Sequence, residues 1–199
     1  MSELLDSTVG RPRGPAGFAR AWLTVILHPR RFFREAVVPG EQAPGLLFAM
    51  AVVAVAETSR LLLVADAVPI DVGPAALSAA FWLGAAVLLV TPATLHLVAA
   101  LQTVLLVPFV SDRGGVSETV QVLGYATAPC ALAGLPSPEL RALVTIWGFV
   151  LLALGIGEVH GPRFEPAAAL AAVPGAIVFG YGFRGFAAVE TVLRQWYVI

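Results

Sequence analysis

The amino-acid sequence predicts an all-α protein: a polytopic membrane helix bundle with about five transmembrane helices and an N-terminal amphipathic interfacial helix. Of its 199 residues, 58% are hydrophobic and only 13% are charged, and the mean hydropathy is +0.86. Apolar stretches separated by short polar segments follow a basic N-terminal segment. Because a soluble core of this size cannot hide so much apolar surface, the bilayer must act as solvent for much of the chain.

The first part of the chain precedes the apolar stretches. Residues 1–16 carry glycine and proline without an apolar period, so we expect a flexible lead-in and no secretory signal. Residues 17–43 are expected to form an amphipathic basic cytoplasmic arm, in which Phe18 and Trp22 share a helix face and Pro29 restarts the helix. Aromatic side chains mixed with arginines lie well in the headgroup plane, although a short helix packed on the protein's own loops is the alternative. The predicted contacts to the membrane surface or a partner are Trp22, His28, Arg30, Arg31, Phe32, Phe33 and Arg34.

A five-helix transmembrane domain is expected over residues 44–185. Residues 44–65 reach roughly 30 Å as a helix, which suffices for the first crossing. Residues 74–110 then run for 37 residues without a charged side chain, which is too long for one untilted crossing. They form either two short crossings hinged at Thr91 and Pro92 or one kinked, tilted helix. We expect the single helix, because a hairpin would have to satisfy its turn backbone at membrane depth.

Three further crossings and a tail are expected. The third covers residues 118–135, which are only weakly apolar, the fourth covers residues 140–157, and the fifth covers residues 167–183. Small residues near the end of the last helix are expected to let it approach a neighbour closely: Gly180, Gly182 and Gly185. Residues 186–199 place apolar side chains at helical spacing, which predicts an amphipathic tail that continues the last helix or folds onto the interface.

The placement of arginine predicts the orientation. All twelve basic residues are arginines; six of them precede the first crossing, and none lies in the loop after it. Because positively charged segments stay on the cytoplasmic side, we expect a multi-pass protein of the cell membrane with a cytoplasmic N-terminus.

Several polar side chains lie inside the predicted crossings. Glu57 and Arg60 are three residues apart in the first crossing, where they form an ion pair or belong to a polar cavity. His96 and Gln102 lie in the long second segment, and a lone histidine there is expected to make an interhelical hydrogen bond. Tyr125 places a polar aromatic ring in the third crossing. These five residues are the predicted intramembrane polar positions.

The sequence offers no pattern for catalysis or metal binding. It contains no nucleotide-binding glycine loop, nucleophile elbow or HExxH motif. Glu158 and His160 are two residues apart and do not share a helix face, and the single cysteine, Cys130, lies in an apolar stretch. We therefore expect no enzyme activity, no cofactor, no metal ion and no nucleic-acid partner.

The order of features resembles the Yip family of multi-pass membrane proteins, named in eukaryotes for interaction with Ypt/Rab GTPases. A W-x-x-x-x-L-H-P-x-x-F-F pattern begins at Trp22, a Gly-Tyr-Ala-Thr-Ala-Pro segment begins at Gly124, and Trp147 lies in the fourth crossing. The resemblance covers roughly residues 18–185 and implies five membrane helices and a cytoplasmic N-terminus, with a prokaryotic branch as the expected origin. The Asp-Leu-Tyr-Gly-Pro motif of eukaryotic members has no counterpart before the first crossing, so GTPase binding is not carried over.

The predicted function follows from the arm and from the lack of a catalytic pattern. We expect a non-enzymatic membrane-organising or interaction scaffold, including as a subunit of a larger membrane complex, that contacts the lipid bilayer and anionic headgroups. Other membrane proteins or a second copy of the chain are further expected partners. The alternative is a transporter or channel component, in which the polar intramembrane residues converge on a cavity.

Overall fold

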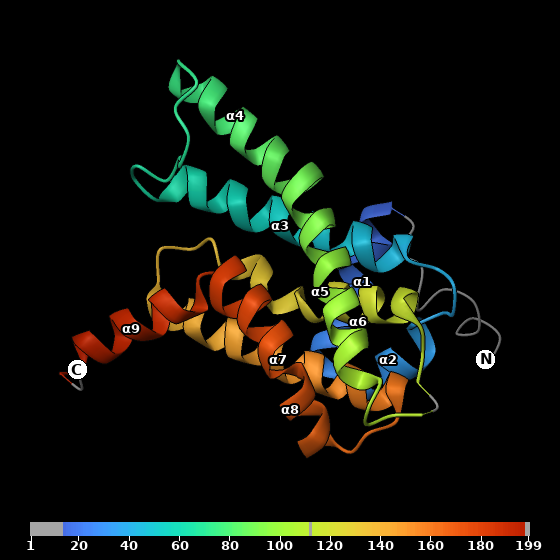
Figure 1. The fold of residues 1–199 in the computed structure, drawn as a ribbon. Coiled ribbons are helices and arrows are strands. Elements are labelled where there is room, and N and C mark those ends of the chain that lie inside the picture. Colours follow the sequence, from blue (N-terminus) through green and yellow to red (C-terminus); the bar gives the residue numbers. More distant parts are fainter. Residues whose placement is uncertain (1–13, 112, 198–199) are drawn as a thin grey trace.

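The computed structural model describes residues 14–111 and 113–197, and all regular secondary structure in these residues is helical (Figure 1). The predicted lead-in therefore lies largely outside the described residues. Four helical stretches are long and apolar enough to cross a membrane: Ala43–Leu63, Ala75–Leu106, Pro138–His160 and Phe164–Gly182. The prediction of a helical membrane bundle is confirmed.

The second of these stretches is one continuous helix of 32 residues. It consists of α4 (Ala75–Ala85), the π-helical turn η1 (Ala86–Val90) and α5 (Thr91–Leu106). Pro92 has no N–H to donate and its ring crowds the preceding turn, so the helix widens before it. The hydroxyl of Thr91 donates to the Ala86 carbonyl over 2.7 Å, and the helix changes direction between α4 and α5 (Figure 1). A single kinked helix was the correct choice over two short crossings.

The predicted third crossing has an interrupted structure. It begins as α6 (Val116–Ala126) and continues as the 3₁₀ helix η2 (Ala128–Leu132). Pro129, which cannot supply an α-helical N–H, marks the change. The segment is too short to count as a continuous spanning helix, but it is largely buried within the bundle.

The remaining helices complete the bundle. A long helix, α7 (Pro138–His160), starts where the hydroxyl of Ser137 accepts the N–H of Leu140 over 3.2 Å. It is followed by α8 (Phe164–Gly175) and the π-helical segment η3 (Ala176–Gly182). The tail then forms a separate helix, α9 (Gly185–Gln195), which packs on α7 instead of continuing the last crossing.

Five segments alternate in direction through the bundle. At one end, called the arm end, the start of α3 (Ala43–Leu63), the start of α6 and the end of α7 meet the N-terminal helices. There the N–H of Gly40 donates to the Ser117 hydroxyl over 3.2 Å. At the opposite end, Glu57 of α3 lies beside Trp82 of α4 and Arg184, which follows η3. α3, α6–η2 and α8–η3 thus run away from the arm end, whereas α4–α5 and α7 run toward it. The cytoplasmic location of the arm end stays a prediction.

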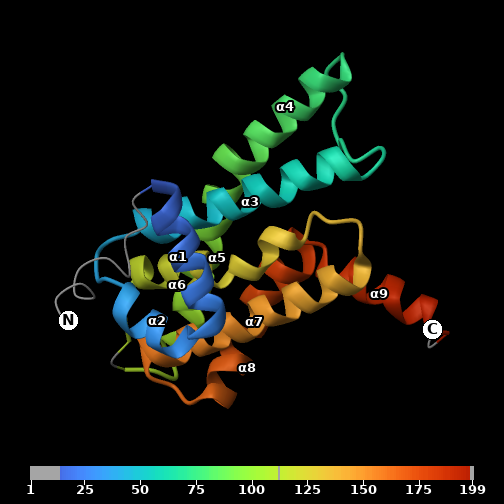
Figure 2. The ribbon, with the colours of Figure 1, turned by 180° about the vertical axis from the view of Figure 1, so that it is seen from behind.

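The N-terminal arm is part of the core. Helices α1 (Gly14–Leu27) and α2 (Pro29–Ala36) lie across α6 and α7 (Figure 2). Phe32 packs edge-on against Tyr125, with 4.9 Å between ring centroids, and Phe48 packs on the same ring at 5.2 Å. This aromatic cluster joins the arm, α3 and α6 at the centre of the buried region.

Glycines let α3 and α6–η2 touch through their backbones. A Cβ atom on Gly124 would overlap the backbone of Gly45, and a Cβ atom on Gly134 would overlap the Ala56 carbonyl and the Ser59 side chain. The two contacts lie at successive points along both segments, so the segments run parallel and side by side. Gly185 likewise lies against Thr145 of α7, which agrees with the expected close approach near the last crossing.

This packing generates a first prediction. Gly124→Ala should lower the free energy of unfolding by about 1–3 kcal/mol, because the added methyl group forces α3 and α6 apart. Gly84→Ala is the matched control: Gly84 is also helical but has no atom within 4 Å of an added Cβ, and alanine favours a helix over glycine. Thermal unfolding in detergent micelles measures the difference, and equal stability of the two variants would contradict the close contact.

Candidate functional site

Helix α2 has two chemically different faces. Its inner face buries Phe32 and Phe33, which are 0% and 1% exposed. Its outer face carries Arg30, Arg31 and Arg34, whose side chains are 60%, 62% and 63% exposed. Pro29 begins α2, and the helical period of 3.6 residues then places the phenylalanine pair and the three arginines on opposite sides of this short helix.

Polar contacts hold helices α1 and α2 on the bundle. The indole Nε1 of Trp22 donates to the Ala128 carbonyl over 2.6 Å, at the break between α6 and η2. Glu158, near the end of α7, accepts from Arg30 at 3.1 Å and pairs with Arg34 at 3.2 Å, using one carboxylate oxygen for each. Sequence reasoning did not identify Glu158 as a partner of the arm; its position beside the arm end was the only signal.

The outer face of the arm remains accessible. Leu23 and Leu27 of α1 are more than half exposed, and His28 lies between the two helices with an exposed ring. Together with the arginines of α2 they form a surface, called the basic arm face: Leu23, Leu27, His28, Arg30, Arg31 and Arg34. Apolar anchors beside cations are typical of helices that lie at a membrane surface.

The prediction for the arm needs a correction at three positions. Trp22, Phe32 and Phe33 were expected to contact the membrane surface or a partner, but they pack against the bundle of their own chain. The apolar stripe of an amphipathic helix can face lipid or protein, and here it faces protein. Contact of His28 and the three arginines with headgroups stays a prediction.

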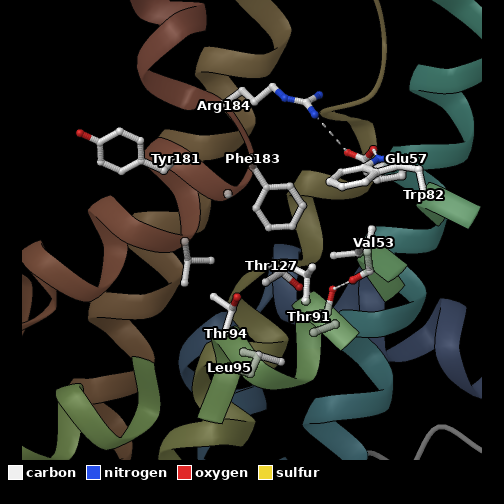
Figure 3. Close-up of a pocket in the computed structure, with 16 residues that line it drawn as sticks. Val53, Glu57, Trp82, Thr91, Thr94, Leu95, Thr127, Tyr181, Phe183 and Arg184 are labelled. Carbon is white, nitrogen blue, oxygen red and sulfur yellow. Dashed lines mark hydrogen bonds and ion pairs between the residues drawn. The ribbon is translucent and has the colours of Figure 1, made fainter. Parts of the chain in front are cut away.

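A cavity of about 260 Å³ lies near the opposite end of the bundle (Figure 3). It lies between α3, the kinked helix α4–η1–α5 and η3. Two of its wall hydroxyls are already used by the backbone: Thr91 donates to the Ala86 carbonyl and Thr127 to the Gly124 carbonyl, each over 2.7 Å. Thr94 adds a further hydroxyl, and most of the remaining wall is hydrocarbon, including Val53 and Phe183.

One end of the cavity is charged. Glu57 accepts from Arg60 Nη2 at 2.6 Å and from the Trp82 indole at 2.8 Å, and Arg184 Nη2 lies 3.8 Å from its other carboxylate oxygen. The side chains of Glu57 and Arg60 are only 16% and 8% exposed. Arg60 also donates to the Ala67 carbonyl. The sequence left open whether Glu57 and Arg60 form a structural ion pair or belong to a polar cavity. The structure shows the ion pair, and of the two residues Glu57 lines this cavity.

Arg184 has an unusual backbone. Its φ of 60° places it in the left-handed region, just before α9 begins. For a residue other than glycine this conformation costs on the order of 1 kcal/mol. The turn directs the guanidinium toward Glu57 at the mouth of the cavity (Figure 3).

The other predicted intramembrane residues lie elsewhere. His96 makes the expected interhelical hydrogen bond, with its Nε2 2.9 Å from Gln42 Oε1. Gln102 donates to the Leu170 carbonyl over 3.2 Å, and Tyr125 is fully buried in the aromatic cluster. None of these three lines the cavity. The convergence of polar residues that the transporter alternative requires is therefore not seen at this cavity.

A further buried polar contact was not predicted as a site. His160 ends α7 with 1% exposure, and its Nε2 lies 3.3 Å from the Thr119 hydroxyl. Within residues 14–111 and 113–197, no three histidine, cysteine, aspartate or glutamate side chains gather in a way that could hold a metal ion.

Comparison with known families decides the identity. The family model described as Yip1 domain matches residues 23–183, which is most of the chain. The chain belongs to the Yip1 family. Comparisons with curated proteins and with solved structures gave no match. The Yip1 match agrees with the resemblance seen in the sequence, whereas the expected prokaryotic branch is not confirmed.

The Yip1 domain contains most of both sites. The matched residues include the arginines of α2, Glu158, Glu57 and Trp82. Two residues lie immediately outside it: Trp22, which anchors the arm, and Arg184, at the mouth of the cavity.

The anchoring of the arm generates a second prediction. Trp22→Phe should lower the free energy of unfolding by about 1 kcal/mol, because the phenyl ring cannot donate to the Ala128 carbonyl. Trp196→Phe, at an exposed position after α9, is the control and should have little effect. Unfolding in detergent micelles measures both, and an unchanged Trp22→Phe variant would mean that the indole bond does not hold the arm.

Proposed function

We propose that this Yip1 family protein is a non-enzymatic membrane scaffold, whose basic arm face holds anionic lipid headgroups. The single observation that carries the proposal is the docked helix α2, which buries Phe32 and Phe33 and leaves three arginines outside. A cation near an anionic membrane surface gains about 1 kcal/mol, so three arginines on one helix provide a useful attraction.

The rigidity of the arm favours a scaffold. Because the arm is held by Trp22, by the phenylalanine pair and by Glu158, its arginines have a fixed position relative to the spanning helices. A fixed surface loses less conformational entropy on binding than a mobile segment does. Leu23 and Leu27 extend the same face and supply apolar anchors. Other membrane proteins, or a second copy of the chain, are the partners that we propose for such a platform.

The arm generates a third prediction, tested with the full chain because the arm is part of the core. In nanodiscs, residues 14–36 should exchange amide hydrogens more slowly when phosphatidylglycerol replaces part of the phosphatidylcholine. Arg31→Glu should reduce this difference, because the net charge of the three exposed arginine positions falls from +3 to +1. Arg31 is chosen because, among residues 14–111 and 113–197, its ion pair is with Glu35 of its own helix, at 2.9 Å, and not with another helix of the bundle.

Arg194→Glu is the control for overall charge. Arg194 lies on α9 and pairs with Glu190 at 2.8 Å, far from the arm. The headgroup effect on residues 14–36 should persist in this variant. Equal exchange in both lipids for the unmodified protein would contradict headgroup binding by the arm.

A transporter or channel component is the second candidate function. The observation that favours it is a cavity among spanning helices with a carboxylate, Glu57, in its wall. Against it, His96, Gln102 and Tyr125 do not continue a polar path from this cavity. The scaffold therefore remains the better supported proposal.

Solute flux tests this candidate and gives a fourth prediction. If Glu57 carries or gates a solute, Glu57→Gln should reduce flux through proteoliposomes containing the protein. If the protein is a scaffold, liposomes with and without it should be equally tight to ions and small polar solutes, whichever variant they contain.

A further inference from the structure

We propose that the cavity between α3, α4–η1–α5 and η3 binds an anionic phospholipid of the surrounding bilayer. One acyl chain lies in the apolar body of the cavity, and the headgroup lies at Arg184. This site is at the opposite end of the bundle from the basic arm face, and it does not depend on the proposed scaffold function.

The body of the cavity suits a hydrocarbon chain. Most of the wall is hydrocarbon, including Val53, Leu95 and Phe183. The wall hydroxyls of Thr91 and Thr127 donate to backbone carbonyls, and Thr94 adds one further threonine hydroxyl. At about 260 Å³, the cavity is slightly smaller than typical ligand sites, which begin at ~300 Å³. It therefore has room for part of one acyl chain, and the rest of the lipid stays in the bilayer.

The cavity is open to the region where lipid lies. Val90 and Tyr181 belong to its wall and are 50% and 75% exposed, so the cavity reaches the outer surface of the bundle. Leu88 and Leu89, on the same helix as Val90, are also exposed. Exposed leucines on a helix of spanning length mark a lipid-facing surface. A chain from the bilayer can thus enter from the side, without crossing water.

The charge at the mouth selects an anionic headgroup. Glu57 pairs with two arginines there, Arg60 at 2.6 Å and Arg184 at 3.8 Å. One carboxylate between two guanidinium groups leaves a surplus of one positive charge in this group. Arg60 is 8% exposed and also donates to the Ala67 carbonyl, whereas Arg184 is 39% exposed. Arg184 is therefore the arginine better placed to bind a phosphate.

The depth of the charged group agrees with a headgroup position. Glu57 lies six residues before Leu63, the last residue of α3, which is about 9 Å along the helix axis. A phosphate at Arg184 is therefore near the end of the spanning helix, while the cavity extends from it toward the bundle centre (Figure 3).

Trp82 provides the probe, because its ring lies in the wall of the cavity beside Glu57. Bromine atoms on an acyl chain quench tryptophan fluorescence at short range. The full-length protein is placed in phosphatidylcholine nanodiscs that contain a small fraction of brominated phosphatidylglycerol or brominated phosphatidylcholine. The contribution of Trp82 is the quenching of the unmodified protein minus the quenching of Trp82→Phe. This contribution should reach half its maximum at an approximately fivefold lower fraction of brominated phosphatidylglycerol than of brominated phosphatidylcholine.

Two substitutions should shift this preference in opposite directions. Arg184→Gln should remove it, since the headgroup loses its cation. Glu57→Gln should strengthen it, since the competing carboxylate is neutralised. Because Glu57 also contacts the indole of Trp82, its substitution can change the fluorescence itself. The two brominated lipids are therefore compared with each other within each variant. If Arg184→Gln does not fold, Arg184→Gly removes the same side chain and also relieves the left-handed backbone.

Arg194→Gln is the matched control, and its headgroup preference should equal that of the unmodified protein. Equal quenching by the two lipids, or equal loss in Arg194→Gln and Arg184→Gln, would overturn the proposal. Displacement of the brominated lipid by excess inorganic phosphate would also overturn it, because the occupant would then be a soluble anion. The hydrogen-exchange result for the arm, including Arg31→Glu, does not affect the quenching of Trp82. Headgroup binding by the arm and lipid binding in the cavity are therefore tested independently.

Discussion

The backbone contact between α3 and α6–η2 is the constraint on which the rest of the structure depends. Helices in lipid gain little from apolar burial against each other, so they associate through close packing and polar contacts. Gly45, Gly124 and Gly134 permit that packing along both segments. The parallel pair then fixes the depth of Tyr125, on which the arm and α3 place their aromatic rings. It also fixes the depth of Thr127, which forms part of the cavity wall.

The break in the α6–η2 segment connects this pair to the N-terminal arm. Pro129 ends the α-helical hydrogen bonding, and the Ala128 carbonyl beside it accepts the Trp22 indole. An interruption at membrane depth is tolerated where the protein itself covers it, and here α1 supplies part of that cover. The arm is consequently a structural part of the bundle as well as a candidate binding surface. Its basic outer face cannot move away without exposing Phe32 and the interrupted backbone.

The sequence predicted what depends on local patterns and missed what depends on distant contacts. Apolar length identified the spanning helices, and the spacing of Glu57 and Arg60 indicated their ion pair. Trp82, Glu158 and Arg184 were not predicted as site residues, because their partners are 25 to 128 positions away in the chain. The inward orientation of the phenylalanine pair in α2 was also missed. An apolar stripe has the same sequence signature whether it faces lipid or protein, and only the packing of the other helices distinguishes the two.

The two ends of the bundle use the same electrostatic arrangement. At the arm end Glu158 pairs with two arginines of α2, and at the opposite end Glu57 pairs with Arg60 and Arg184. In each group one carboxylate serves two guanidinium groups, so each group retains positive charge, although the whole chain has a formal net charge of -1. Charge averaged over a membrane protein therefore conceals how it is distributed along the bundle.

Each carboxylate is also a competitor for the anion that its arginines attract, since it already occupies part of their hydrogen-bonding capacity. The arginine with the weakest protein contact is then the one most available to a ligand. At the cavity this is Arg184, whose distance from Glu57 is 3.8 Å, compared with 2.6 Å for Arg60.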